Sequence, residues 1–239
     1  MNLDVAMVST AGGKPVNEDS VWFSVRGTRL AAAVADGLGA HGDGDIASQA
    51  AIRAIENAFK NAHRPLVDVL PDCLAAANKA VLAHQTAGRS MKSTAIVLAI
   101  EPSQAFFAHV GDSRGYGFCN CSITYQTMDH SVSQLAVLRN MITPQQIRFH
   151  EGRSRLLRAL GMDETAEAEI TPLKPPEEGD AYLLCSDGFW EYVTEDEMEI
   201  DLAKSASAES WLSYMLARIG ANVAASHDNL SAIAVLCKG

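Results

Sequence analysis

The chain has 239 residues, 48% of them hydrophobic, and carries a formal net charge of −10 with an isoelectric point near 5.1. This length and hydrophobic content suffice for a full core, while the 19 scattered basic residues argue against a nucleic-acid or anionic-membrane partner, which requires clustered Lys and Arg. No apolar run approaches the ~20 residues that span a bilayer, and the first residues do not resemble a signal peptide. We therefore expect a soluble, cytoplasmic protein.

The composition shows no break that would mark a linker. Without a low-complexity tract or an internal repeat, a single domain over residues 1–239 is expected. The five cysteines form no Cys-x-x-Cys pair, which favours buried, reduced thiols over a disulfide framework or a zinc site.

The first half of the chain predicts three strands followed by two helices. Residues 5–9 and 21–25 are rich in β-branched residues, and 30–35 is apolar throughout, as in a strand buried on both faces. Apolar residues then recur at helical spacing over 46–59 and 66–85.

Strands return in the second half of the chain and give way to further helices. Short strands are predicted at 93–100, 104–110, 115–121, 122–127, 181–186 and 230–236. The remaining segments predict broken helix over 131–160 and amphipathic helices over 195–204 and 208–221. Because strands and helices come in blocks, the pattern favours an α+β fold of antiparallel sheets flanked by helices.

Acidic residues recur at the ends of the predicted strands. Asp36, Asp112, Asp187 and Asp228 all have this placement, and three of them lie next to glycine. A lone Asp-Gly is usually an ordinary turn, and the adjacent acids in 17–19 are usually a solvated loop. Surface acids are not expected to follow such a rule, however, so we interpret the four as a group.

Carboxylates gathered at one edge of a sheet repel one another unless cations lie among them. An oxygen-only set of ligands suits Mg²⁺ or Mn²⁺, and the sequence offers no Cys/His cluster of the kind that favours zinc. Two such ions could share a bridging water and direct it at phosphorus.

Five short motifs resemble, in order, those of the PP2C (PPM) family of metal-dependent serine/threonine phosphatases, in its compact bacterial form. They lie at 17–19, 34–39, 110–114, 185–190 and 228–231. Each motif alone is weak, but their order and spacing make the resemblance specific. It implies a central β-sandwich of two antiparallel sheets flanked by helix pairs, with a dinuclear Mn²⁺ or Mg²⁺ centre at one end.

The resemblance also implies a role for each matching residue. Asp36 would bridge both ions, the Gly37 carbonyl and Glu18 would serve one side, and Asp187 with Asp228 the other. A further acid, Asp112, matches the one that helps hold a third, weaker ion. Asn229 is expected to orient Asp228.

Two positions depart from the family pattern beside the expected phosphate site. Lys14 stands where the family commonly has an Arg that clamps phosphate; Lys supplies charge but no bidentate fork. Leu38 stands where eukaryotic members often have a His as general acid, and the nearby His41 is not the matching position. Asp36 and Lys14 are thus the catalytic candidates.

The leading hypothesis is hydrolysis of phosphoserine and phosphothreonine in proteins by direct attack of a metal-bridging water, opposing a serine/threonine kinase, in a monomeric enzyme. Lys14 and Leu38 motivate an alternative, a catalytically weak regulatory module that binds phosphoproteins. Against it, the four main acids, Glu18, Asp36, Asp187 and Asp228, are all present. A metal-dependent nuclease or phosphodiesterase is disfavoured because an acidic chain would repel a polyanionic substrate.

Overall fold

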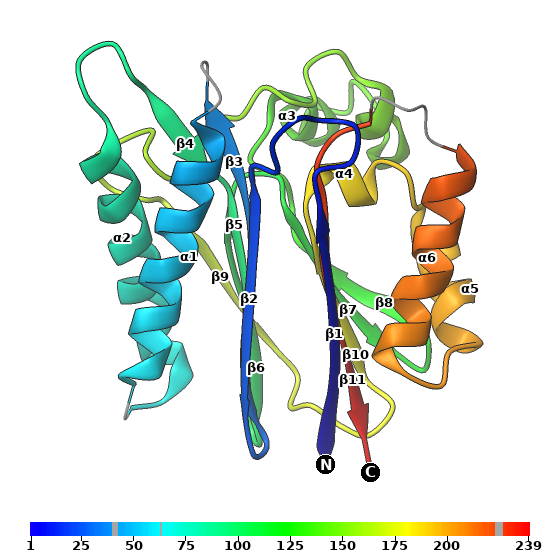
Figure 1. Ribbon diagram of the computed structural model, residues 1–239. Helices are drawn as coiled ribbons and strands as arrows, with labels where there is room; N and C mark the ends of the chain where they lie inside the picture. The colour runs from blue at the N-terminus through cyan, green and yellow to red at the C-terminus, as the bar shows by residue number, and fades with distance from the viewer. Residues whose placement is uncertain (40–42, 63, 223–226) are drawn as a thin grey trace.

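The structure, a computed structural model, describes residues 1–39, 43–62, 64–222 and 227–239. Over these residues the chain forms two β-sheets that lie face to face, with helices against the outer face of each sheet (Figure 1). All the paired strands of the two sheets run antiparallel. The α+β arrangement of antiparallel sheets and flanking helices predicted from the block order is therefore confirmed, as is the central β-sandwich that the family resemblance implied.

The first sheet joins the two ends of the chain. Its strands, in spatial order, are β1 (Asn2–Thr10), β11 (Leu230–Lys238), β10 (Ala181–Cys185), β7 (Arg114–Cys119) and β8 (Ser122–Gln126). β1 pairs with β11 along its whole length, from Asn2 opposite Lys238 to Thr10 opposite Leu230. The two termini consequently lie side by side at one end of the sandwich (Figure 1).

The second sheet carries the apolar strand that the sequence singled out. Its strands, in spatial order, are β2 (Asp19–Arg26), β3 (Arg29–Gly39), β5 (Ala95–Glu101), β6 (Gln104–Val110) and β9 (Glu169–Leu173), with β4 (Met91–Ser93) paired to the end of β3. The sequence analysis did not predict β9, an edge strand of five residues that includes Pro172. So short a segment, interrupted by a proline, carries almost no strand signal.

Helix pairs cover the two outer faces. They are α1 (Gly44–Lys60) and α2 (Leu66–His84) on one side, and α5 (Glu195–Ala203) and α6 (Ala208–Asn222) on the other (Figure 1). The shorter helices α3 (Val132–Leu138), η1 (Pro144–Phe149) and α4 (Asp187–Trp190) lie near one end of the sandwich. Within the described residues, no helix combines the length and apolar character that crossing a bilayer requires.

One predicted strand ends earlier than expected. The sequence predicted a strand over 115–121, but β7 ends at Cys119, and Asn120 and Cys121 adopt φ of 51° and 63°. Two successive residues with positive φ form the tight turn that suits the twist of a two-residue hairpin, here between β7 and β8. The helical segment predicted over 131–160 is likewise limited to α3 and η1.

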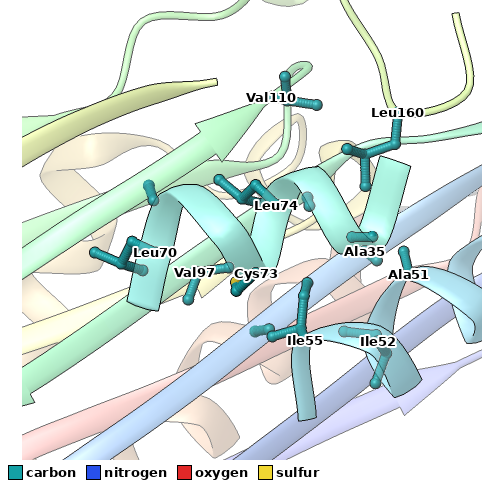
Figure 2. Packing of buried hydrophobic residues seen from close by; sticks show 14 of the residues in the cluster. Ala35, Ala51, Ile52, Ile55, Leu70, Cys73, Leu74, Val97, Val110 and Leu160 are labelled. Carbon is teal, nitrogen blue, oxygen red and sulfur yellow. The ribbon is translucent and has the colours of Figure 1, made fainter. Parts of the chain in front are cut away.

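Strand β3 is buried on both faces, as its sequence predicted. Its odd residues, such as Ala33, pack with α1 and α2, and its even residues, such as Val34, pack against the other sheet. Figure 2 shows the helix side of this core, where Ile55 and Leu74 lie over β3 and its neighbours. Burial on both sides holds the end of β3 firmly in place.

Candidate metal centre

The predicted acids come from separate elements and meet at one edge of the sandwich. Asp36 lies near the end of β3 and is paired in register with Asp19, the first residue of β2. On the opposing sheet, Asp187 begins α4 directly after β10, and Asp228 precedes β11, which is antiparallel to β10. Asp112 lies in the turn between β6 and β7.

The carboxylates of this cluster are close enough to act on one another. Burial, and then the negative charges of Asp187, Asp19, Asp112 and Asp228, raise the pKa of Asp36 well above its ordinary value. Burial followed by the charge of Asp187 does the same to the pKa of Asp112. Burial, and after it the negative charges of Glu191 and Asp19, raise the pKa of Asp187 to about 7. Such mutual repulsion is what bound cations relieve.

Asp19 is the member of this cluster that sequence reasoning missed. Its side chain is buried, Oδ2 accepts a hydrogen bond of 2.7 Å from Ser186 Oγ, and Oδ1 has no partner among the described residues. Burial raises the pKa of Asp19 to about 6. A signal was available: Asp19 alternates with Val21 and Phe23, which pack against the core between the sheets.

Glu18 and Gly37, expected to serve one side of the centre, do lie together. Glu18 Oε1 accepts a 3.0 Å hydrogen bond from the N–H of Gly44, the first residue of α1. A Cβ at Gly44 would lie 2.4 Å from the Gly37 oxygen and 2.7 Å from Glu18 Oε1. Only glycine at position 44 leaves room for this approach.

Backbone and hydroxyl contacts hold Asp36 and connect it to the turn that carries Asp112. The N–H of Asp36 donates to Thr94 Oγ1 at 3.0 Å, and the carbonyl of Asp36 accepts from the N–H of Thr94 at 2.8 Å. The Thr94 hydroxyl also shares a 2.6 Å hydrogen bond with that of Ser113. Thr94 therefore connects the end of β3 to the turn that carries Asp112.

Asn229 orients the neighbouring residues of the cluster. Its N–H donates to Asp228 Oδ1 at 2.8 Å, and its side-chain oxygen accepts from the N–H of Glu18 at 2.9 Å. Its amide nitrogen donates to the carbonyls of Ala11 and Val16 at 3.0 Å each. This agrees with the supporting role expected of Asn229 and extends it to the loop before β2.

Lys14 reaches the mouth of the cluster. Its ammonium nitrogen lies 3.4 Å from Asp228 Oδ1, and both side chains are about half exposed, at 49% and 54%. The Lys14 ammonium group, which is expected to bind the substrate phosphate, thus lies at the same edge as the acids. His41, the other candidate considered, lies outside the described residues.

The donors present at this edge fit divalent cations. In the part of the chain that the structure describes they are oxygen atoms only, they carry excess negative charge, and the buried Asp19 Oδ1 lacks a hydrogen-bond partner. Hard cations such as Mg²⁺ and Mn²⁺ prefer such ligands.

A second group of ligand-type residues lies behind the turn that carries Asp112, where His130 is hydrogen-bonded to Gly111. Atoms of His109, His130 and Glu169 approach within 4.8 Å of one another. The two imidazole rings are stacked, however, with centroids 4.6 Å apart and an interplanar angle of 15°. Ring-nitrogen lone pairs lie in the ring plane, so two nearly parallel rings cannot direct them at one ion. We interpret this group as a packed histidine pair.

The fold and the cluster together define a class: an α–β–β–α sandwich protein with an edge of carboxylates suited to divalent cations. A family model described as protein phosphatase 2C matches residues 10–232. The chain therefore belongs to the protein phosphatase 2C family, as the motif resemblance indicated.

Individual relatives agree with this assignment. The serine/threonine phosphatase stp of Listeria monocytogenes is 30% identical over 210 residues, which cover 84% of this chain and 82% of that protein. PstP of Mycobacterium tuberculosis is 35% identical over 202 residues, 81% of this chain and 37% of that protein. A crystal structure of the PstP catalytic domain in complex with 2 manganese ions is similar at a TM-score of 0.83 with 28% identity, covering 99% of each chain.

Proposed function

We propose that this protein is a metal-dependent phosphatase that removes phosphate from phosphoserine and phosphothreonine in protein substrates. The observation that carries the proposal is the convergence of mutually repelling carboxylates, buried or partly exposed, from both sheets at one edge, with Asp19 Oδ1 lacking a partner among the described residues. The names of the relatives, serine/threonine phosphatases, support the same activity.

Two ions, Mn²⁺ or Mg²⁺, would be held at this edge, and the PstP structure in complex with 2 manganese ions supports a centre of two ions. The residues that would hold them are Asp36, Glu18, the Gly37 carbonyl, Asp187 and Asp228, with Asp19 added from the structure and Asp112 for a third ion. When bound, the ions would supply Lewis acidity that activates a water molecule and neutralises phosphate charge.

The chain's own residues would bind and orient the substrate. Lys14, half exposed beside Asp228, is placed to attract the phosphate group as a point charge, without the bidentate fork of an arginine. Partly buried hydrogen bonds, from the backbone N–H of Asp36 to Thr94 and from the N–H of Asn229 to Asp228 Oδ1, hold these two residues in place, so little reorganisation would accompany the reaction.

The test is hydrolysis of a small aryl phosphate and of a phosphothreonine peptide with added Mn²⁺. We expect activity to disappear with a chelator and to fall by on the order of 10³-fold in Asp187→Asn, the size of effect found when transition-state charge stabilisation is lost. Asp163→Asn, at an exposed acid outside the cluster, is the matched control. Activity that survives both chelation and Asp187→Asn would contradict the proposal.

The alternative of a weak regulatory binding module gains no support here. Glu18, Asp36, Asp187 and Asp228 all lie at the same edge, whereas a decayed relative would be expected to have lost a ligand. Tight Mn²⁺ uptake in calorimetry without turnover of phosphopeptides would nevertheless favour it.

The proposal extends to the setting of the enzyme. We place it in the cytoplasm as a monomer with a single domain over 1–239, acting on phosphoproteins that a serine/threonine kinase modifies. The acidic charge of −10 supports a protein rather than a nucleic-acid substrate. Light scattering of the purified chain tests the monomer.

A further inference from the structure

The turn that carries Asp112 is held on both sides of that residue. Before it, Gly111 adopts a φ of +103°, and a Cβ there would lie 2.7 Å from Thr94 Cγ2. The backbone N–H of His130 donates to the Gly111 carbonyl at 2.9 Å, and the N–H of Gly111 donates to His130 Nδ1 at 3.2 Å. After it, the Ser113 hydroxyl is bonded to Thr94.

Asp112 itself is bonded to a distant tryptophan. The indole N–H of Trp190 donates a 3.0 Å hydrogen bond to the main-chain carbonyl of Asp112, and both residues are buried, with 1% and 5% of their surface exposed. Trp190 is the last residue of α4, the single helical turn that begins at Asp187. One hydrogen bond therefore connects the Asp112 turn to the turn of helix that bears Asp187.

The indole ring is itself fixed. The guanidinium of Arg114 lies over it, with Cζ 3.5 Å from the ring centroid, and a second guanidinium, that of Arg148, is 5.7 Å away. Arg114 is held in turn by two 2.8 Å hydrogen bonds to the buried Asp129. Cation–π contact and a buried bidentate ion pair leave the ring little freedom to rotate.

This hydrogen bond fixes the Asp112 turn relative to α4. Trp190 holds the Asp112 carbonyl, and Trp190 and Asp187 belong to the same single helical turn. Without the indole N–H, the Asp112 turn could shift relative to Asp187, and the like charges of the two acids favour such a shift.

We propose that Trp190 is a positioning residue, whose indole N–H fixes the position of Asp112 relative to Asp187 and thereby sets the affinity for the third ion assigned to Asp112. The inference rests on the proposed metal-dependent function and goes beyond it, since it makes the affinity of the weakest ion site depend on a residue that is not itself a metal ligand.

The variant Trp190→Phe tests this by removing the N–H donor while keeping an aromatic ring beneath Arg114. Trp211→Phe is a matched control, because the indole of Trp211 is equally buried and donates a 3.1 Å hydrogen bond to the Met198 carbonyl between α6 and α5. Both variants lose one buried donor, so a general loss of stability affects both alike.

The readout is calorimetric titration with Mn²⁺, supported by electron paramagnetic resonance of the free ion. In Trp190→Phe we expect the weaker binding phase to lose about 10-fold in affinity, as for other residues that orient a metal ligand, while the tighter phase changes by less than about twofold. In Trp211→Phe both phases should stay within about twofold of the unmodified protein. If the Mn²⁺ affinity of the weaker binding phase is the same in the two variants, the inference is overturned.

Two further measurements keep the test decisive. If Trp190→Phe does not fold, replacing Trp190 by benzothienylalanine, which has the same shape but no N–H, takes its place. In an Asp112→Asn background, Trp190→Phe should weaken Mn²⁺ binding by less than about twofold, because both changes act on one site. A full 10-fold additional loss would show that Trp190 acts elsewhere.

Failure of the inference differs from failure of the proposed function. If the unmodified protein neither binds Mn²⁺ nor hydrolyses phosphopeptides, the proposed function and the inference both fail. If it does both, and Trp190→Phe titrates like Trp211→Phe, only the role of Trp190 fails.

Discussion

The hydroxyl of Ser186 donates a 2.7 Å hydrogen bond to Oδ2 of Asp19, a residue 167 positions away in the sequence. The same hydroxyl accepts a 3.0 Å hydrogen bond from the N–H of Ser231. Ser186, which immediately precedes α4, thus connects the start of that helix to the beginnings of β2 and β11. Its side chain and that of Asp19 are both buried.

Replacing Ser186 by alanine should weaken Mn²⁺ binding in a pH-dependent manner. A hydrogen bond to a carboxylate favours its charged form, so Ser186→Ala raises the pKa of Asp19 above its value of about 6. Calorimetry should therefore show a larger loss of affinity at about pH 6 than at about pH 8, together with a loss of about 1–2 kcal/mol in the free energy of unfolding. Ser213→Ala, which removes a hydroxyl bonded to the Glu209 carbonyl in α6, is the control. An equal loss of affinity at both pH values would contradict this account.

Gly188→Ala should destabilise the protein strongly and displace the metal ligands. A Cβ at position 188 would lie 2.0 Å from the carbonyl oxygen of Asn229, so α4 and the start of β11 would have to separate. We expect a loss of about 3 kcal/mol or more in urea denaturation, at the upper end of single-residue effects. Gly220→Ala in α6, where a Cβ meets nothing within 4 Å, should instead stabilise by about 0.5–1 kcal/mol. Similar unfolding free energies for the two variants would argue against this close approach.

The metal-free protein should lose stability as pH rises. Asp187 has a pKa of about 7 and Asp19 a pKa of about 6 in the folded state, and burial is the largest cause of both increases from 3.8. In the unfolded chain these groups ionise first, so the free energy of unfolding falls as pH rises from about 4 to 7. Asp36 and Asp112, whose pKa values are also raised by burial, act in the same direction. Thermal unfolding in a chelator should give a higher Tm at about pH 5 than at about pH 8.

Added Mn²⁺ should reverse this order, because it binds the ionised carboxylates of the folded state only. Asp187→Asn provides the control, since removing one titrating group should flatten the pH dependence in the chelator. A chelated protein whose Tm rises from about pH 5 to about pH 8 would contradict the electrostatic description of the cluster.

Lys14 should act on substrate binding more than on turnover. Its ammonium lies 3.4 Å from Asp228 Oδ1 and is half exposed, so Lys14→Met should raise KM for a phosphopeptide by about 10-fold with a smaller change in kcat. Lys14→Arg should preserve or lower KM, because a guanidinium can bind phosphate with two hydrogen bonds. Lys79→Met, on the exposed surface of α2, is the control. An unchanged KM in Lys14→Met would remove Lys14 from the phosphate site.

Much of the fold followed from local sequence patterns. The run of apolar residues in β3 predicted a strand buried on both faces, and the structure packs Ala33 and Val34 on its opposite sides. The edge strand β9 was missed, because five residues that include a proline form a strand only where β6 offers them hydrogen-bond partners. Propensity at that site is overridden by tertiary context.

The sequence by itself determined which residues stand at the ends of buried strands, and so it predicted that Asp36 and Asp187 belong to one site. Only the tertiary structure decided that Asp19 joins them, and that Trp190 holds the Asp112 turn. A strand-end acid is signalled by its immediate neighbours along the chain. A contact between positions 19 and 186, or 112 and 190, exists only because the pairing and facing of two sheets bring those positions together, and no local pattern encodes that distance.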